Sequence, residues 1–380
     1  MMSFDEFKDF VKDHIKDILP DRYDTAEVAI SENIKNNDQK VTYVSIRQEG
    51  QDIAPSIILE PFYAEYANEG DLDSVMSQIA KVQMDHENAI KVDKEIFTDW
   101  DKAKDHLLCR LINREHNEEY LADKPFTPME DLAVIYAIKV ESNDREMASV
   151  VITDHMMEIY GVSLEQMHEQ AMANIDSDKI VFRDISAVLR DMMPGSDENM
   201  FVAPEGKPSL YVITNDIMVN GAGVILCQQK MDEIAEQLGG DFIIIPSSTH
   251  ECLIMPKDDS FDRTVIENMI MEVNSTMVPL SDRLSDHSYV YDASEHELVR
   301  ADRMEAREND RKMEDRDRNA ESGEIMKDDR SDSKSEKAAG KEMDPKRTTM
   351  KERLAEKKLE ASNLNANLPK PEKKLETALT

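Results

Sequence analysis

The sequence predicts an α+β fold with mixed, mostly antiparallel sheets and packed helices in two lobes, followed by a charged C-terminal tail that is disordered or helical. Three patterns support this prediction. Short apolar runs separated by Asn, Asp, Gly or Pro are typical of strands joined by turns. Other segments repeat apolar residues every three or four positions, which is typical of amphipathic helices. No aromatic residue follows Tyr291, so little beyond it can build a core.

The first lobe is expected at residues 1–123, and it begins with an amphipathic helix that Ser3 caps. Two β-prone runs follow, joined at Asn36-Asn37-Asp38 in a predicted hairpin turn. The segment 113–128 is polar and contains a predicted turn. The expected elements are a helix at 3–19, strands at 28–34 and 41–46, a short apolar run at 57–59, a helix ending at Gly70, a longer helix capped by Asp71, and a strand at 107–112.

The second lobe is expected at residues 124–294, and the fold signal is strongest from Leu210 to Pro256. The bare apolar run Phe242–Ile245 suits a strand buried on both faces. The whole stretch predicts strand, strand, helix, strand, turn, strand, at 210–213, 221–226, 228–238, 242–245, 246–248 and 252–255. Around it we expect strands at 132–140 and 147–152, helices at 153–160 and 163–173, apolar runs at 180–182 and 185–192, a loop at 193–208, a helix at 261–273 and an apolar run at 289–291.

The third segment, residues 295–380, has a different composition. Residues 302–318 are almost entirely Arg, Asp, Glu and Asn, which cannot offset the entropy cost of ordering. Arg and Glu three or four apart can still support a helix locally. The stretch 346–374 has nine basic and four acidic residues, so it is net positive. We expect this tail to be dispensable for folding and to be a possible contact for an unknown protein partner.

Charge is unevenly distributed along the chain. The formal net charge is −34, but residues 296–380 hold 21 basic and 21 acidic residues. The first 295 residues therefore carry 25 basic and 59 acidic residues and the whole excess. Such a surface repels nucleic acid and anionic lipid, so we expect no nucleic-acid binding through the folded body and no membrane binding. It suits a basic partner or cations, although a plain solvated shell has the same composition.

Three cysteines, Cys109, Cys227 and Cys252, make up too sparse and odd a set for a disulfide framework. They favour a reducing compartment and read as buried thiols. The N-terminus lacks a basic segment leading into an apolar one, so no signal peptide is predicted. No apolar run approaches the ~18–20 residues of a membrane span. Together these features predict a cytoplasmic protein.

Several stretches resemble the bacterial domain-of-unknown-function family numbered 5688, and the resemblance runs from about Phe4 to Tyr291. Its motifs are structural spacings with no catalytic group among them, so the resemblance implies a fold and no activity. The stretches that carry it are Ile57–Gly70 (IILEPFYAEYANEG), Asp131–Tyr136 (DLAVIY), Thr153–Ala171 (TDHMMEIYGVSLEQMHEQA), Leu210–Thr214 with Gly221–Ala222, and Pro246–Glu251 (PSSTHE).

One cluster has the residue types of a catalytic site: Ser247, Ser248, His250 and Glu251 could supply a nucleophile, a base and an orienting acid. The placement favours a simpler interpretation. Ser248 and His250 are only two residues apart, and there is no G-x-S-x-G elbow. Pro and two Ser are typical of a turn between buried strands, with hydroxyls that satisfy free backbone groups.

No other pattern predicts chemistry. Each His-Glu pair lacks the second His of H-E-x-x-H, and no phosphate-binding loop is present, so we predict no metal and no cofactor. Two hypotheses remain open. The first is a non-enzymatic interaction or adaptor protein with an acidic body and a charged tail. The alternative is a hydrolase-like enzyme centred on Ser248, His250 and Glu251. An enzyme should gather those side chains in a pocket, whereas an interaction protein should leave them in a closed turn.

Overall fold

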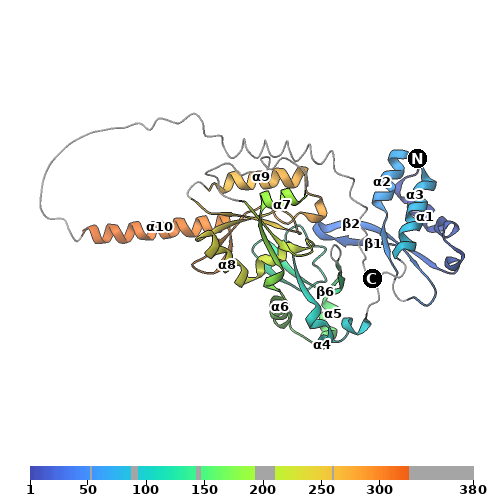
Figure 1. The fold of residues 1–380 in the computed structure, drawn as a ribbon, viewed down its shortest axis with the longest axis horizontal. Helices are drawn as coiled ribbons and strands as arrows, with labels where there is room; N and C mark the ends of the chain where they lie inside the picture. Colours follow the sequence, from blue (N-terminus) through green and yellow to red (C-terminus); the bar gives the residue numbers. More distant parts are fainter. Residues whose placement is uncertain (52–53, 87–92, 143–146, 193–209, 259–260, 325–380) are drawn as a thin grey trace. The chain divides into compact units, whose positions relative to one another are not determined.

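The structure is a computed structural model that describes residues 1–51, 54–86, 93–142, 147–192, 210–258 and 261–324 (Figure 1). Residues 1–300 form one compact unit, and the segment that begins at Ala301 belongs to another. Each unit is described by itself below. The predicted loop at 193–208 and the tail beyond residue 324 lie outside the described residues.

The N-terminal part of the first unit packs three helices on a three-stranded antiparallel sheet. The cap predicted at Ser3 is confirmed, since Ser3 Oγ accepts from Glu6 N at 3.3 Å and Glu6 Oε2 accepts from Ser3 N at 2.7 Å. Phe7, Val11 and Ile15 form the buried face of that helix. The elements are α1 (Phe4–Ile18), β1 (Glu27–Lys35), β2 (Gln39–Arg47), β3 (Ser56–Ile58), α2 (Glu60–Glu69) and α3 (Leu72–His86).

The predicted β1–β2 hairpin is confirmed and is long, with nine paired residues from Glu27↔Arg47 to Lys35↔Gln39. Its tip is the 3-10 turn Asn36–Asp38. Asn37 and Asp38 have φ angles of 61° and 50°, in the left-handed region that Asn and Asp tolerate better than most residues. The tip thereby projects polar side chains beyond the end of the sheet.

A second antiparallel sheet has the order β4-β6-β5, with β7 also paired to β6. The boundary expected at residue 123 falls within this sheet, because β4 precedes it and its partner β6 follows it. One face of the sheet is covered by Leu121 from the loop after β4. The strands are β4 (Leu107–Asn113), β5 (Phe126–Met129), β6 (Leu132–Ser142) and β7 (Met147–Val151).

The third sheet has six strands in the order β13-β12-β10-β11-β9-β8, and all its pairs are antiparallel. Its central strand β10 is buried along its whole length, as predicted for Phe242–Ile245. Phe242 and Ile244 face the main core, while Ile243 and Ile245 face α9. The strands are β8 (Ile180–Asp184), β9 (Tyr211–Asn215), β10 (Phe242–Pro246), β11 (Cys252–Pro256), β12 (Tyr289–Asp292) and β13 (Glu297–Arg300).

The main core lies between the second and third sheets and is closed by α6 and α8, while α7 and α9 lie on the other side of the six-stranded sheet (Figure 1). The helices are α4 (Trp100–Ala103), α5 (Asp154–Tyr160), α6 (Leu164–Ala173), α7 (Ile185–Met192), α8 (Gln228–Leu238) and α9 (Arg263–Thr276). With every described strand pair antiparallel and helices packed on the sheets, the predicted α+β class is confirmed.

One sequence-based expectation was wrong. Residues Gly221–Leu226 form the 3-10 helix η7 and not a strand. Periodicity cannot distinguish a short buried strand from a short buried helix, because both are continuous apolar runs. At Gly221 the chain passes so close to Thr214 and His250 that a side chain would not fit. After the boundary expected at residue 294, β13 pairs with β12 and Val299 is fully buried.

The second unit is described for the helix α10 (Ala301–Glu324) alone. Of the two states expected for the tail, this part is helical. Its sequence mixes Arg with Asp and Glu at helical spacing, which stabilises an exposed helix by about 0.2–0.5 kcal/mol per pair.

Candidate functional site

The predicted site residues lie in the turn 247–251, which joins β10 to β11. Ser248 and Thr249 are only 7% and 6% exposed, and the His250 side chain is 23% exposed. Ser248 N donates to Glu251 O at 3.1 Å, which closes the turn. The five residues are therefore held as a tight connection between two buried strands.

The two serines bond within the turn. Ser247 Oγ donates to Glu251 Oε1 at 3.2 Å, and Ser248 Oγ accepts from His250 N at 3.0 Å. Such a bond from a backbone N–H to the hydroxyl two residues earlier is a common turn device. Within the described part of the chain, no hydrogen bond links Ser248 Oγ to the His250 ring.

Both ring nitrogens of His250 have neighbours from elsewhere in the fold. Nδ1 accepts from Asn220 N at 3.1 Å, which assigns the proton to Nε2. Nε2 lies 3.7 Å from Asp282 Oδ1. The ring therefore links three segments of the chain. A general base for Ser248 would need a free nitrogen facing Oγ.

The backbone of the turn is packed against η7. Thr214 Oγ1 donates to His250 O at 2.7 Å, and Ala222 N donates to Thr249 O at 3.1 Å. A Cβ at Gly221 would lie 2.5 Å from His250 O, so a side chain there would collide with backbone. This close approach explains the glycine and leaves the inner side of the turn closed.

The outer side of the turn contacts the 3-10 helix η8 (Leu280–Asp282), since Thr249 N donates to Asp282 O at 2.8 Å. The same η8 receives the tip of the β1–β2 hairpin. Asn36 Nδ2 donates to Ser281 O at 2.6 Å, and Asn37 Nδ2 donates to Leu280 O at 2.6 Å. The turn thus supports the contact between the hairpin and the rest of the unit.

A fully buried asparagine completes that contact from the loop after β4. Asn117 Oδ1 accepts from Asn37 N at 2.7 Å, and Asn117 Nδ2 donates to Asn113 O at 2.6 Å. Asp38 accepts from Tyr120 N at 2.8 Å and from Glu119 N at 3.1 Å. We call the hairpin tip, η8 and the loop 113–121 the polar junction. Sequence analysis identified the Asn36-Asn37-Asp38 turn but not its buried partner.

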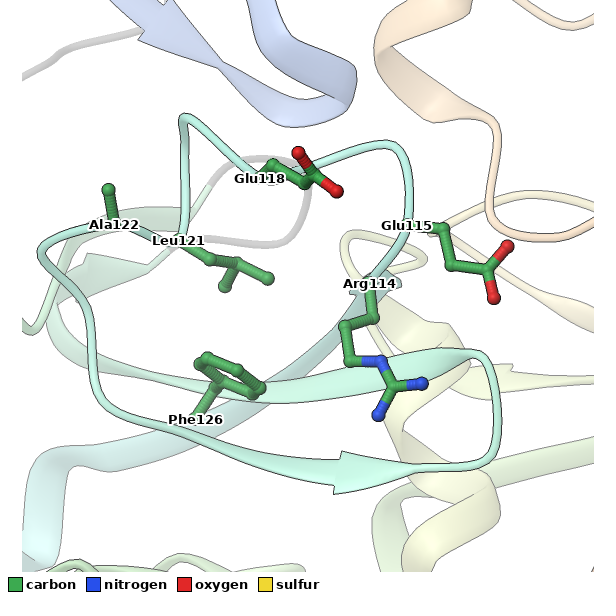
Figure 2. A pocket seen from close by; sticks show the side chains of 6 residues that line it. All are labelled: Arg114, Glu115, Glu118, Leu121, Ala122 and Phe126. Carbon is green, nitrogen blue, oxygen red and sulfur yellow. The ribbon is translucent and has the colours of Figure 1, made fainter.

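The same loop lines a hollow of about 480 Å³ on its other side (Figure 2). Figure 2 shows Leu121 and Phe126 on one side of it and the Arg114 side chain on the other, while Glu115 and Glu118 extend from the loop around it. Arg114 N is fixed by Asp131 O at 2.8 Å. Within the described part of the chain, the Arg114 guanidinium has no ion-pair or hydrogen-bond partner. No motif in the sequence marks this hollow.

A model of a family of unknown function, DUF5688, matches residues 4–293. The chain belongs to this family. The match covers the first unit almost to its end and confirms the resemblance seen in the sequence. No curated protein and no solved structure matches the chain.

The DUF5688 fold buries a second polar cluster deep between its sheets. Asp131, which is 2% exposed, accepts from Ser285 Oγ at 2.7 Å and from Tyr289 OH at 2.8 Å. Burial raises the pKa of Tyr289 well above its ordinary value. The hydroxyls satisfy the buried carboxylate, so this cluster fastens the β5–β6 turn to β12.

All three cysteines of this DUF5688 chain are free thiols. Burial raises the pKa of Cys109 to about 12 and also raises that of Cys252, so these thiols stay protonated and unreactive at neutral pH. Among the described residues, no group of three His, Cys, Asp or Glu side chains is placed to hold a metal ion.

The described helices contain none that is long and apolar enough to cross a membrane.

Proposed function

We propose that this DUF5688 protein is a cytoplasmic interaction protein that binds a basic protein partner and catalyses no reaction. The observation that carries the proposal is the charge of the chain, with 59 acidic against 25 basic residues in the first 295. A surface of one sign attracts partners of the opposite sign and speeds their association.

The geometry of the 247–251 turn supports the non-catalytic side of the proposal. A hydrolase centred there would need Ser248, His250 and Glu251 to converge on one open site. Instead, Ser248 bonds to backbone, Glu251 bonds to Ser247, and the His250 ring joins Asn220 to the neighbourhood of Asp282. No observation favours the hydrolase alternative.

The C-terminal segment extends the proposal to a second contact. Its net-positive stretch at 346–374 has the opposite sign to the body, so it suits an acidic surface on the partner. A partner with both basic and acidic patches would engage the body and the tail at once, which raises the overall affinity through effective concentration.

The test is chemical crosslinking in living cells of the organism that makes this protein, followed by reconstitution of the captured partner with the full purified chain. We expect a complex of fixed stoichiometry by size-exclusion chromatography with light scattering. Its affinity should fall as salt rises, because exposed charges are screened over about 8–10 Å at physiological ionic strength. Deletion of the tail should weaken the complex without abolishing it.

Two results would overturn the proposal. One is a stable complex whose affinity does not change with salt. The other is hydrolysis of an ester, amide or phosphoester by the full chain that both Ser248→Ala and His250→Ala abolish while circular dichroism shows an intact fold. Retained turnover in both variants would point to a contaminant.

A further inference from the structure

The hollow beside the polar junction is lined by a cation, Arg114, whose side chain has no ion-pair or hydrogen-bond partner among the described residues. Neighbouring cations are paired, since Lys124 lies 2.6 Å from Asp123 and Lys40 lies 3.7 Å from Glu119. Arg114 is half-buried, and within the described residues no carboxylate lies within ion-pair distance of it. In a body with such an excess of acidic residues, a guanidinium that lines a hollow and has no partner among the described residues can bind an external anion.

The floor of the same hollow is apolar. Leu121 is buried and Phe126 is half-buried, and both belong to the small cluster that covers the outer face of β4 and β6. They lie across the hollow from Arg114 in Figure 2. A ligand that places a carboxylate on Arg114 would therefore lay an apolar group on Leu121 and Phe126. The volume of about 480 Å³ lies within the range of small-molecule sites.

The two glutamates at the rim of the hollow indicate which second charged group the ligand carries. Glu115 and Glu118 are exposed carboxylates of the same loop, so the hollow as a whole carries one positive and two negative groups. A simple anion gains at Arg114 and is repelled by the rim. A molecule with a carboxylate and an ammonium group satisfies both, with the ammonium group toward Glu118.

We propose that this hollow binds a free amino acid with a large apolar side chain, such as leucine or phenylalanine. Arg114 holds the α-carboxylate through two parallel N–H···O bonds, and Glu118 attracts the α-ammonium group. Leu121 and Phe126 contact the side chain. This proposal does not depend on the partner binding proposed above.

Ligand binding in this hollow should also stabilise the hairpin tip, because the same loop contacts both. Residues 114–121 line the hollow with Arg114 and Leu121 and hold the hairpin tip with Asn117 and the backbone of Tyr120. A ligand that binds the folded loop and not the unfolded chain stabilises the loop by mass action. Amino-acid binding should therefore slow hydrogen exchange at Asn37 and neighbouring amides of the hairpin tip.

The experiment is calorimetry and thermal unfolding of the full chain with four probes. L-phenylalanine carries all three groups, hydrocinnamate lacks the ammonium group, phenethylamine lacks the carboxylate, and L-alanine lacks the large side chain. We expect the highest affinity and the largest rise in melting temperature for L-phenylalanine. Affinity should fall about 10-fold or more for hydrocinnamate and phenethylamine, because each loses an interaction between charged groups. It should fall likewise for L-alanine, because no apolar side chain covers Leu121 and Phe126.

Three variants assign the contacts. Arg114→Gln should weaken L-phenylalanine binding about 10-fold or more, and Arg114→Lys should fall between it and the native chain, because an ammonium group cannot form the paired bonds. Glu118→Gln changes an exposed side chain, so it should weaken binding without affecting folding. The matched control is Arg47→Gln in β2. Arg47 forms an ion pair with Glu27 and does not line the hollow. This variant should bind as the native chain does.

Three results would overturn the inference. The first is no saturable binding of L-phenylalanine or L-leucine at millimolar concentration. The second is equal affinity for hydrocinnamate, which would remove the role of the rim carboxylates. The third is L-phenylalanine binding that Arg114→Gln and Glu118→Gln leave unchanged. None of these results bears on the salt-dependent partner complex, so the two proposals fail separately.

Discussion

The turn 247–251 contacts the polar junction and the loop 114–126 forms part of it, yet the two segments use their polar side chains in opposite ways. In the turn, Ser248 and His250 bond to neighbouring parts of the fold. In the loop, the Arg114 guanidinium has no partner among the described residues, and Arg114 lines a hollow. The residue types found in catalytic sites therefore lie in the closed turn 247–251. The open hollow is lined by residues that form no sequence motif.

The difference shows what a local pattern can and cannot indicate. Ser, His and Glu within five residues attract attention because their chemistry is versatile, but closeness in sequence favours bonds to the local backbone. A ligand site instead needs groups that stay unsatisfied after folding. Which groups those are depends on segments that meet only in three dimensions.

The largest expected effect concerns the strand that carries the closed turn. Ile244 is fully buried in β10, so Ile244→Ala leaves a cavity and should lower the free energy of unfolding by about 2–5 kcal/mol. The control is Ile159→Ala on α5, whose side chain is 44% exposed and should change stability by less than about 0.5 kcal/mol. Urea unfolding of both variants gives the comparison. Equal effects would contradict the central position of β10.

The organisation around Ile244 could be predicted from sequence because strand and helix patterns are local. The Ser3 cap, the hairpin turn at Asn36–Asp38 and the doubly buried β10 were all predicted. The 3-10 helix η7 was not, because its shape follows from the close approach of Gly221 to His250. That contact joins residues about thirty positions apart, and periodicity carries no record of it.

A second prediction tests where the folded unit ends. Truncation after Ser294 removes β13, which pairs with β12 and buries Val299, so the melting temperature should fall by several degrees or more. Truncation after Glu324 keeps β13 and α10 and should leave the melting temperature nearly unchanged, because the removed residues contain no aromatic side chain. Equal melting temperatures for the two truncations would show that β13 contributes nothing to stability.

A third prediction tests the junction that the two loops share. Asn117→Ala removes the acceptor of Asn37 N and the donor to Asn113 O, all in a buried setting. The loss should be about 1–3 kcal/mol, the cost of leaving buried polar groups unsatisfied. Asn268→Ala on the exposed face of α9 is the control and should be neutral or slightly stabilising. Hydrogen exchange should quicken at the hairpin tip in the first variant alone.

Asn117 also shows why the junction could not be predicted. Its sequence neighbourhood, 113–128, is polar and reads as a surface loop. Only the fold brings it beside Asn36 and Asn37, some eighty residues earlier, and buries it completely. The hollow next to it has the same origin, since its apolar floor depends on which face of the sheet the loop covers.

The fourth prediction separates the closed turn from the open loop directly. His250→Ala should cost about 1 kcal/mol of stability, because Asn220 N loses its acceptor at a partly exposed place, and should leave L-phenylalanine binding unchanged. Arg114→Gln should do the reverse, since its guanidinium makes no hydrogen bond or ion pair within the part of the chain that the structure describes. Urea unfolding gives the stability of each variant, and calorimetry gives its affinity for L-phenylalanine. A His250→Ala chain that is stable and has lost binding or activity would make the turn a working site.

The smallest effect belongs to a third kind of polar cluster, which is fully partnered yet exposed. His296 Nδ1 lies 2.6 Å from Asp232 Oδ1, and this hydrogen bond raises the pKa of His296 above its ordinary 6.5 and lowers that of Asp232 below its ordinary 3.8. The histidine contribution is complete below pH 6.5 and is lost as pH rises through the raised pKa. The aspartate contribution is complete above pH 3.8 and is lost as pH falls through the lowered pKa.

The pair should therefore stabilise the β12–β13 hairpin most between about pH 4 and 6.5, and only weakly, because His296 is 62% exposed. An NMR titration of the His296 ring should give a pKa above 6.5 in the native chain, and Asp232→Asn should return it toward 6.5. A native value at or below 6.5 would show that the bond does not persist in solution. Solvent exposure would then explain why this contact adds little to stability, whereas the contacts of the turn 247–251 are more buried.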